Sequence, residues 1–164
     1  MPRVSRRGRP LTDRLRGLPG CVLGLAQLDR DLLDAVEAAS PEHQRQIALW
    51  ATTTACRAAR LTEVPWIAEA LAALAAGEAL PPPFEDPEAS WHRLLSDPTV
   101  PQSTVRSLDG LVPNMLQQAM AFPAIEAAAA PDPLVAAIDT VYHGLQAFGP
   151  PSSRFTAELR GAQA

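Results

Sequence analysis

Residues 132–151 read DPLVAAIDTVYHGLQAFGPP and hold the clearest structural signal in the chain. Apolar residues recur there at alternating spacings of four and three: Leu134, Ile138, Val141, Leu145 and Phe148. This spacing places them on one face of an α-helix, and Asp132-Pro133 is a typical helix start. The glycine and two prolines after Phe148 end the pattern. We therefore predict a helix over residues 133–148 that packs through one continuous apolar stripe.

The same signals extend to both sides of this helix. Ser40-Pro41 and Asp86-Pro87 are further helix starts, and the apolar period stays near 3.6 with no alternating β-branched run. We predict helices over residues 27–39, 41–60, 63–76 and 87–96, two or three short kinked helices within 103–130, and no strands. Residues 78–86 contain three consecutive prolines and predict an extended connection. The expected fold is all-α, an irregular bundle of about six helices with a proline-rich connection and a flexible basic N-terminal arm.

Length and composition limit the number of domains. The chain has 164 residues, of which 47% are hydrophobic and 20% charged, as in ordinary globular proteins. We expect a flexible Arg-rich arm over residues 1–22, a single all-helical domain over 23–150 and a mobile C-terminal tail over 151–164. In this tail only Phe155 and Leu159 are candidate anchors. No stretch approaches the roughly 20 apolar residues of a membrane span.

The N-terminal arm carries most of the positive charge. Residues 1–20 hold six arginines against one acidic residue, Asp13, although the whole chain has a net charge of −4. Such an arm can bind nucleic acid or an anionic membrane through its charges alone. The candidate polyanion-binding residues are Arg3, Arg6, Arg7 and Arg9. The alternative is a solvated leader, which the lack of aromatic residues for stacking on bases favours.

Two carboxylate and histidine pairs stand four residues apart, namely Glu88 with His92 and Asp139 with His143. Spacing of four puts both groups on one helical face, as in metal-binding bundles. The helical phase, however, turns Asp139 and His143 away from the apolar stripe, so we expect them to face water. We predict surface ion pairs and no metal site.

The remaining histidine, tryptophan and methionine residues either pack in the core or line a ligand-binding site. His43 lies near the start of the helix at 41–60, on its apolar side. A pocket between this helix and the Trp91 helix would be lined by His43, Trp50, Glu88, Trp91 and His92. Met115, Met120 and Phe122 lie on a proline-broken segment, and side chains of this kind line either a core or a binding groove.

Catalytic motifs do not stand out in the sequence. A nucleophile elbow, a phosphate-binding glycine loop and a zinc-binding His-Glu-x-x-His are all missing, and Cys56, the one candidate nucleophile, has the position of an apolar filler. We therefore expect no cofactor and no catalytic residue, although enzyme status stays uncertain.

The favoured function follows by elimination. We expect a non-enzymatic protein-interaction or regulatory accessory domain with a protein partner. The alternative is a small-ligand-binding protein or enzyme that uses the pocket described above. The presence of only two cysteines, with no apolar export segment before Cys21, favours the cytoplasm. The bias to alanine, proline and arginine indicates a GC-rich bacterial source.

Overall fold

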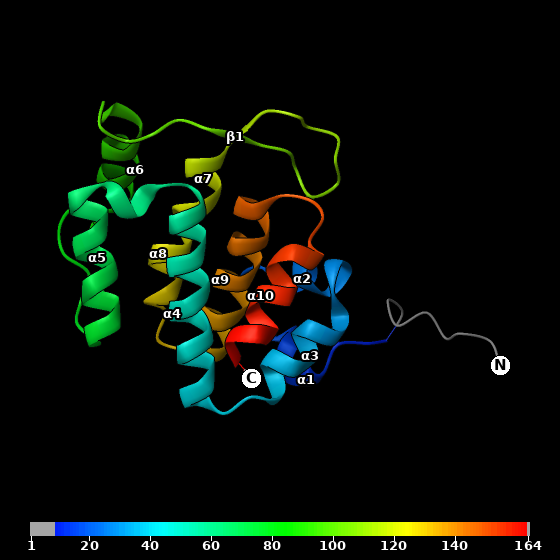
Figure 1. Ribbon diagram of the computed structural model, residues 1–164. Coiled ribbons are helices and arrows are strands. Elements are labelled where there is room, and N and C mark those ends of the chain that lie inside the picture. The colour runs from blue at the N-terminus through cyan, green and yellow to red at the C-terminus, as the bar shows by residue number, and fades with distance from the viewer. Residues whose placement is uncertain (1–8, 164) are drawn as a thin grey trace.

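Helices α4 and α9 pack along each other at the centre of the molecule (Figure 1). The structure, a computed structural model, describes residues 9–163. In chain order its elements are α1 (Asp13–Arg16), α2 (Val22–Leu28), α3 (Arg30–Ala38), α4 (Pro41–Ala58), η2 (Leu61–Glu63), α5 (Pro65–Ala76), α6 (Pro87–Ser96), β1 (Thr104–Val105), β2 (Met115–Leu116), α7 (Gln117–Ala121), α8 (Pro123–Ala128), α9 (Pro133–Phe148) and α10 (Ser153–Gln163). The predicted all-α fold class is confirmed.

The predicted capping residues begin the long helices. Ser40 accepts a hydrogen bond from the backbone N–H of His43, and Asp132 accepts one from Leu134. Each satisfies a donor that the first turn leaves free, and proline follows where no N–H is needed. Helices α6 and α9 span the predicted ranges, and α4 ends two residues earlier than predicted.

Two predicted helices have different limits in the structure, and one of them is divided. The helix expected over 27–39 is split at Asp29, whose extended backbone ends α2 and whose side chain accepts from the N–H of Leu32 to begin α3. The helix expected from residue 63 begins at Pro65, because the residue before a proline is driven into extended geometry. Val64 has that geometry.

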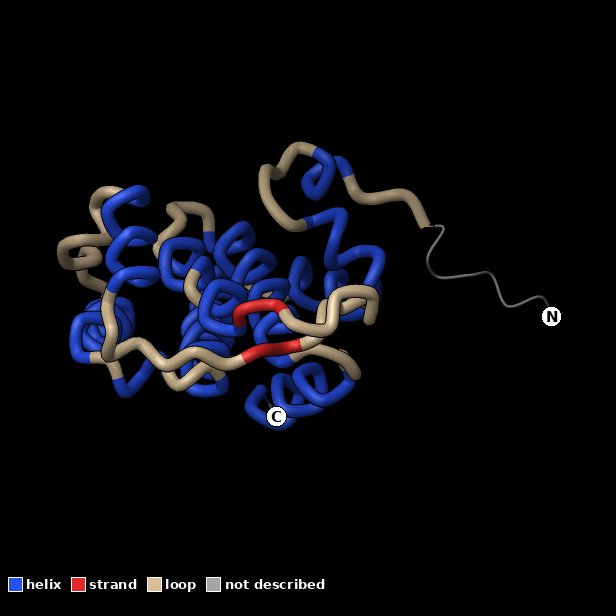
Figure 2. The backbone as a smooth tube through the Cα atoms, turned by 90° about the horizontal axis from the view of Figure 1, so that it is seen from above, coloured by secondary structure: helices blue, strands red, loops and turns tan. Residues whose placement is uncertain are grey.

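The prediction of no strands is wrong for one short hairpin. Strands β1 and β2 pair antiparallel, with Val105 opposite Met115, and Figure 2 shows them in red across the top of the bundle. Each strand has two residues, which is too short to show an alternating pattern in the sequence.

Two hydrophobic clusters lie on either side of the central helices. One gathers Trp66, Phe84 and Phe122 with the end of α4, and the other gathers Leu25, Leu33, Ile138 and Phe155. Figure 1 places α5 and α6 on one side of α4 and places α1 to α3 with α10 on the other.

The end of the chain differs from the expected mobile tail, because residues 153–163 form α10. Phe155 is fully buried, with its ring centroid 5.4 Å from that of Trp50 and 5.2 Å from that of Phe148. Gly144 on α9 makes this contact possible, since a Cβ there would lie 2.4 Å from the Phe155 ring.

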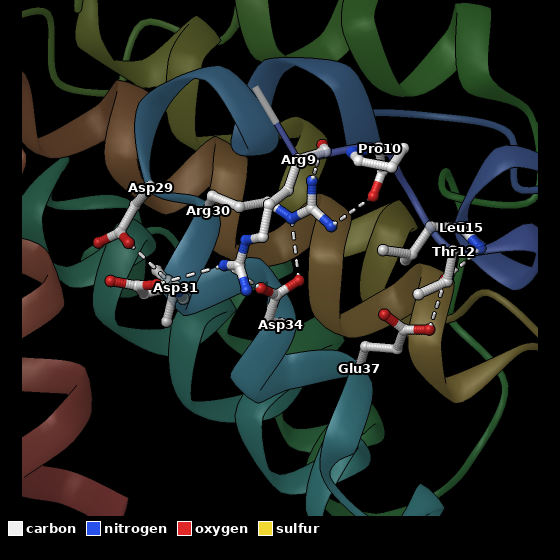
Figure 3. A network of polar contacts seen from close by, with 10 residues as sticks. Arg9, Pro10, Thr12, Leu15, Asp29, Arg30, Asp31, Asp34 and Glu37 are labelled. Atoms are coloured by element: carbon white, nitrogen blue, oxygen red, sulfur yellow. Dashed lines mark hydrogen bonds and ion pairs between the residues drawn. The ribbon is translucent and has the colours of Figure 1, made fainter. Parts of the chain in front are cut away.

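The described part of the expected arm is also docked on the fold. Leu15 of α1 is buried in the second cluster, and Arg30 of α3 donates to the backbone carbonyls of Arg9 and Pro10 at 2.7 and 3.1 Å. Arg9 itself pairs with Asp34 at 2.6 Å. Figure 3 shows these contacts converging on α3, so residues 9–16 form a strap across that helix.

Candidate ligand-binding cavity

A cavity of about 340 Å³ opens between α2, the β1–β2 hairpin and α9. Its size falls in the range of small-molecule sites. Its wall is formed by Gly24, Gln27 and Leu28 of α2, Ser107, Leu108, Asp109 and Met115 of the hairpin, Met120 of α7, and Tyr142 and Gln146 of α9. Four of these side chains are apolar, and the polar ones come from three different elements.

Two glutamines hold the hairpin in place over the helices. Gln118 is buried and donates to the carbonyl of Ala59 and to the hydroxyl of Ser103, both at 2.8 Å. Gln117 donates to the carbonyl of Ala147 at 2.8 Å and accepts from the Ser103 hydroxyl. The hairpin is therefore tied to the ends of both central helices.

The loop of the hairpin is closed by its own polar groups. Asp109 accepts from the Ser107 hydroxyl at 2.6 Å and from the backbone N–H of Leu111 at 2.9 Å. These two hydrogen bonds lower the pKa of Asp109 below its usual value, the Ser107 contact contributing most. The carboxylate is thus ionised and already engaged at neutral pH.

Tyr142 forms the floor of the cavity against a glycine. A Cβ on Gly24 would lie 2.7 Å from the Tyr142 ring, so only glycine allows α2 to approach α9 this closely. Burial, followed by the nearby Cys21 thiol, raises the pKa of Tyr142. The phenol therefore stays neutral at physiological pH and can donate a hydrogen bond.

The expectation that Asp139 and His143 face water is wrong. The backbone N–H of Cys21 donates to Asp139 at 2.9 Å, and both Asp139 and His143 are half-buried. The N-terminal segment contacts Asp139 through Gly20 and Cys21, and an arm that stays free of the fold would not make these contacts. Burial lowers the pKa of His143, whose Nδ1 lies 3.3 Å from the amide oxygen of Gln146 on the cavity wall.

The five residues predicted to line a pocket lie in separate surroundings. His43 and Trp50 lie on the part of α4 that contacts α10, where His43 is hydrogen-bonded to Gln163 and Trp50 contacts Phe155. Trp91 packs edge-on against Phe122 in the other cluster, 5.0 Å between centroids. Glu88 and His92 are exposed on α6. The structure does not bring these residues together.

Some residues of the cavity could be identified from the sequence. Met115 and Met120 were singled out as side chains typical of a groove or a core, and both are half-buried on its wall, whereas Phe122 is core. Tyr142, Gln146 and Gly24 carried no such signal, because their proximity depends on how α2 and the hairpin dock on α9.

Among the predicted polyanion-binding residues, Arg9 is described and pairs with Asp34 and Asp31. Arg3, Arg6 and Arg7 lie outside the described residues. Cys56 is fully buried, and burial raises its pKa to about 12, so the thiol is protonated and part of the core.

Two features are absent from residues 9–163. No group of three or more potential metal ligands was found there, nor any helix with the length and apolar character needed to cross a membrane. Comparisons of the chain with protein-family models, curated proteins and solved structures found no match.

Proposed function

We propose that the protein binds a small, neutral and partly apolar molecule in the cavity between α2, the hairpin and α9. The observation that carries this proposal is the cavity itself, about 340 Å³ with an apolar wall and a few polar groups directed from three elements. This is the ligand-binding alternative of the sequence analysis, moved from the α4–α6 region to the hairpin.

The wall indicates the kind of ligand. Leu28, Leu108, Met115 and Met120 offer adaptable apolar contact, because methionine side chains fit irregular shapes. Tyr142 and Gln146 can donate and accept hydrogen bonds. The ionised Asp109 disfavours an anion, so a neutral molecule with a hydroxyl or amide group fits best.

A regulatory role is the second candidate, and the exposed tip of the hairpin favours it. Leu111 is 81% exposed and Val112 48% exposed, two and three residues beyond the cavity-lining Asp109. A ligand that contacts Ser107 to Asp109 would change the mobility of this tip and hence its contact with a protein partner. We include a cytoplasmic setting in this proposal, which the two free thiols support, and a bacterial source, which rests on the bias to alanine, proline and arginine.

The neutral fluorescent probe N-phenyl-1-naphthylamine tests the ligand proposal. We expect saturable binding at one site per chain, and about tenfold weaker binding by Met115→Trp, which fills the cavity. Leu23→Trp is the matched control, because Leu23 is 68% exposed on the same helix α2 and adds an indole outside the cavity. Equal affinity of Met115→Trp and wild type, or no saturable binding, would refute the proposal.

A further inference from the structure

The outward face of α4 is partly apolar and partly open, with Trp50 at its edge packed against Phe155 of α10. Half-buried Leu49, Trp50 and Thr53 lie along it. Two hollows of about 330 and 390 Å³ adjoin it and share Gln46 and Leu49. In Figure 1 this helix runs in front of α8, between α5 and α10.

Opposite charges stand at the two ends of this face. Glu42 and Arg57 are both exposed, and neither has an ion-pair partner within residues 9–163. The neighbouring Arg45 donates to the carbonyls of Ala128 and Pro131, so its guanidinium is held at the end of α8 rather than in an ion pair with Glu42. With about 100° per residue, Glu42 and Arg57 lie only about 60° apart around the helix.

The charges and apolar residues of this face are arranged so that two copies of the face can pair about a two-fold axis. The midpoint between Glu42 and Arg57 falls between Leu49 and Trp50. If two copies of α4 pack antiparallel about a two-fold axis at that point, each Glu42 meets an Arg57 of the other copy. Leu49 then faces Trp50 near the axis, as an isologous interface requires.

We propose that the occupant of this face is a second copy of the chain, which forms a two-fold symmetric dimer through antiparallel α4 helices. The interface is small and pairs one main helix from each copy, so the dimer is weak and concentration-dependent. This inference does not rest on ligand binding, because other elements line the cavity.

Sedimentation velocity on the full chain, from about 1 µM to about 1 mM, tests the dimer with charge reversals. We expect Glu42→Arg and Arg57→Glu each to weaken dimerisation about tenfold, because each places two like-charged pairs in the interface. Mixing these two variants, or combining both changes in one chain, restores opposite charges at every pair. Either should return the affinity to within about threefold of wild type.

Glu88→Arg is the matched control, an identical charge reversal on the exposed surface of α6, and it should leave dimerisation unchanged. A wild-type chain that stays monomeric would overturn the proposal. A dimer insensitive to the two reversals, or one not restored by the double change, would also overturn it, because the interface would then lie elsewhere or have another geometry.

Discussion

Arg30 is the residue on which the position of the N-terminal strap depends. Its side chain is buried, donates to two carbonyls of the strap, and pairs with Asp34 at 2.9 Å (Figure 3). The guanidinium thereby ties the strap to α3. A buried arginine of this kind costs much more to remove than an exposed one.

We expect Arg30→Leu to lower the free energy of unfolding by about 3 kcal/mol and to release residues 9–16 to protease. Arg16→Leu serves as control, because Arg16 is exposed and its pair with Asp13 at 3.5 Å is worth less than about 1 kcal/mol. Urea unfolding and limited proteolysis measure both effects. Equal stability of the two variants would contradict a structural role for Arg30.

His143 makes stability depend on pH. Burial lowers its pKa in the folded state below the ordinary 6.5, so the unfolded chain binds more protons in the interval between the two values. Stability therefore falls as the pH drops through about 6.5. We expect urea unfolding to show this loss between about pH 7.5 and 5.5, smaller in His143→Gln and unchanged in His92→Gln, whose side chain is exposed. The same slope in His143→Gln and wild type would contradict the account.

At the scale of elements, α10 shows why the end of the chain could not be predicted. Its sequence, SRFTAELRGAQ, includes serine, threonine and glycine, which favour a helix only weakly. Its helix is stabilised by packing of Phe155 against Trp50 and Phe148, contacts from distant parts of the chain. By contrast, α6 and α9 carry their own caps and apolar periods, so their limits were predictable.

The docking of α10 depends on Gly144. We expect Gly144→Ala to destabilise the fold by about 2 kcal/mol, because the added methyl group overlaps the Phe155 ring. Gly161→Ala is the matched control on α10 itself: a Cβ there meets nothing within 4 Å, so alanine should stabilise the helix by about 0.5–1 kcal/mol. Thermal unfolding of both variants gives the comparison. Equal shifts in the same direction would contradict this packing.

At the scale of the whole molecule, the two clusters share the central helix α4, which gives Ala55 and Cys56 to one and Ile47 and Ala51 to the other. We therefore expect one cooperative unfolding transition, with calorimetric and van't Hoff enthalpies in a ratio of about 1. Differential scanning calorimetry measures it. Two separate transitions would show that the clusters fold independently.

The site was less predictable than the fold, because the site depends on how distant elements of the whole molecule pack together. Helix starts and apolar stripes are local, whereas the cavity arises where α2 and the hairpin meet α9. Met115 and Met120 could be recognised as groove-type side chains. The approach of Gly24 to Tyr142 could not, because it depends on how α2 docks on α9, and no helix is predicted from the sequence before residue 27.

The most direct test of the central claim is an NMR titration of the ¹⁵N-labelled chain with N-phenyl-1-naphthylamine. The account predicts amide shifts concentrated at Gly24, Ser107, Met115 and Gln146, which come from the separate elements around the cavity. Shifts centred on the α4–α10 contact or on α6, or no saturable shifts at all, would contradict ligand binding in this cavity.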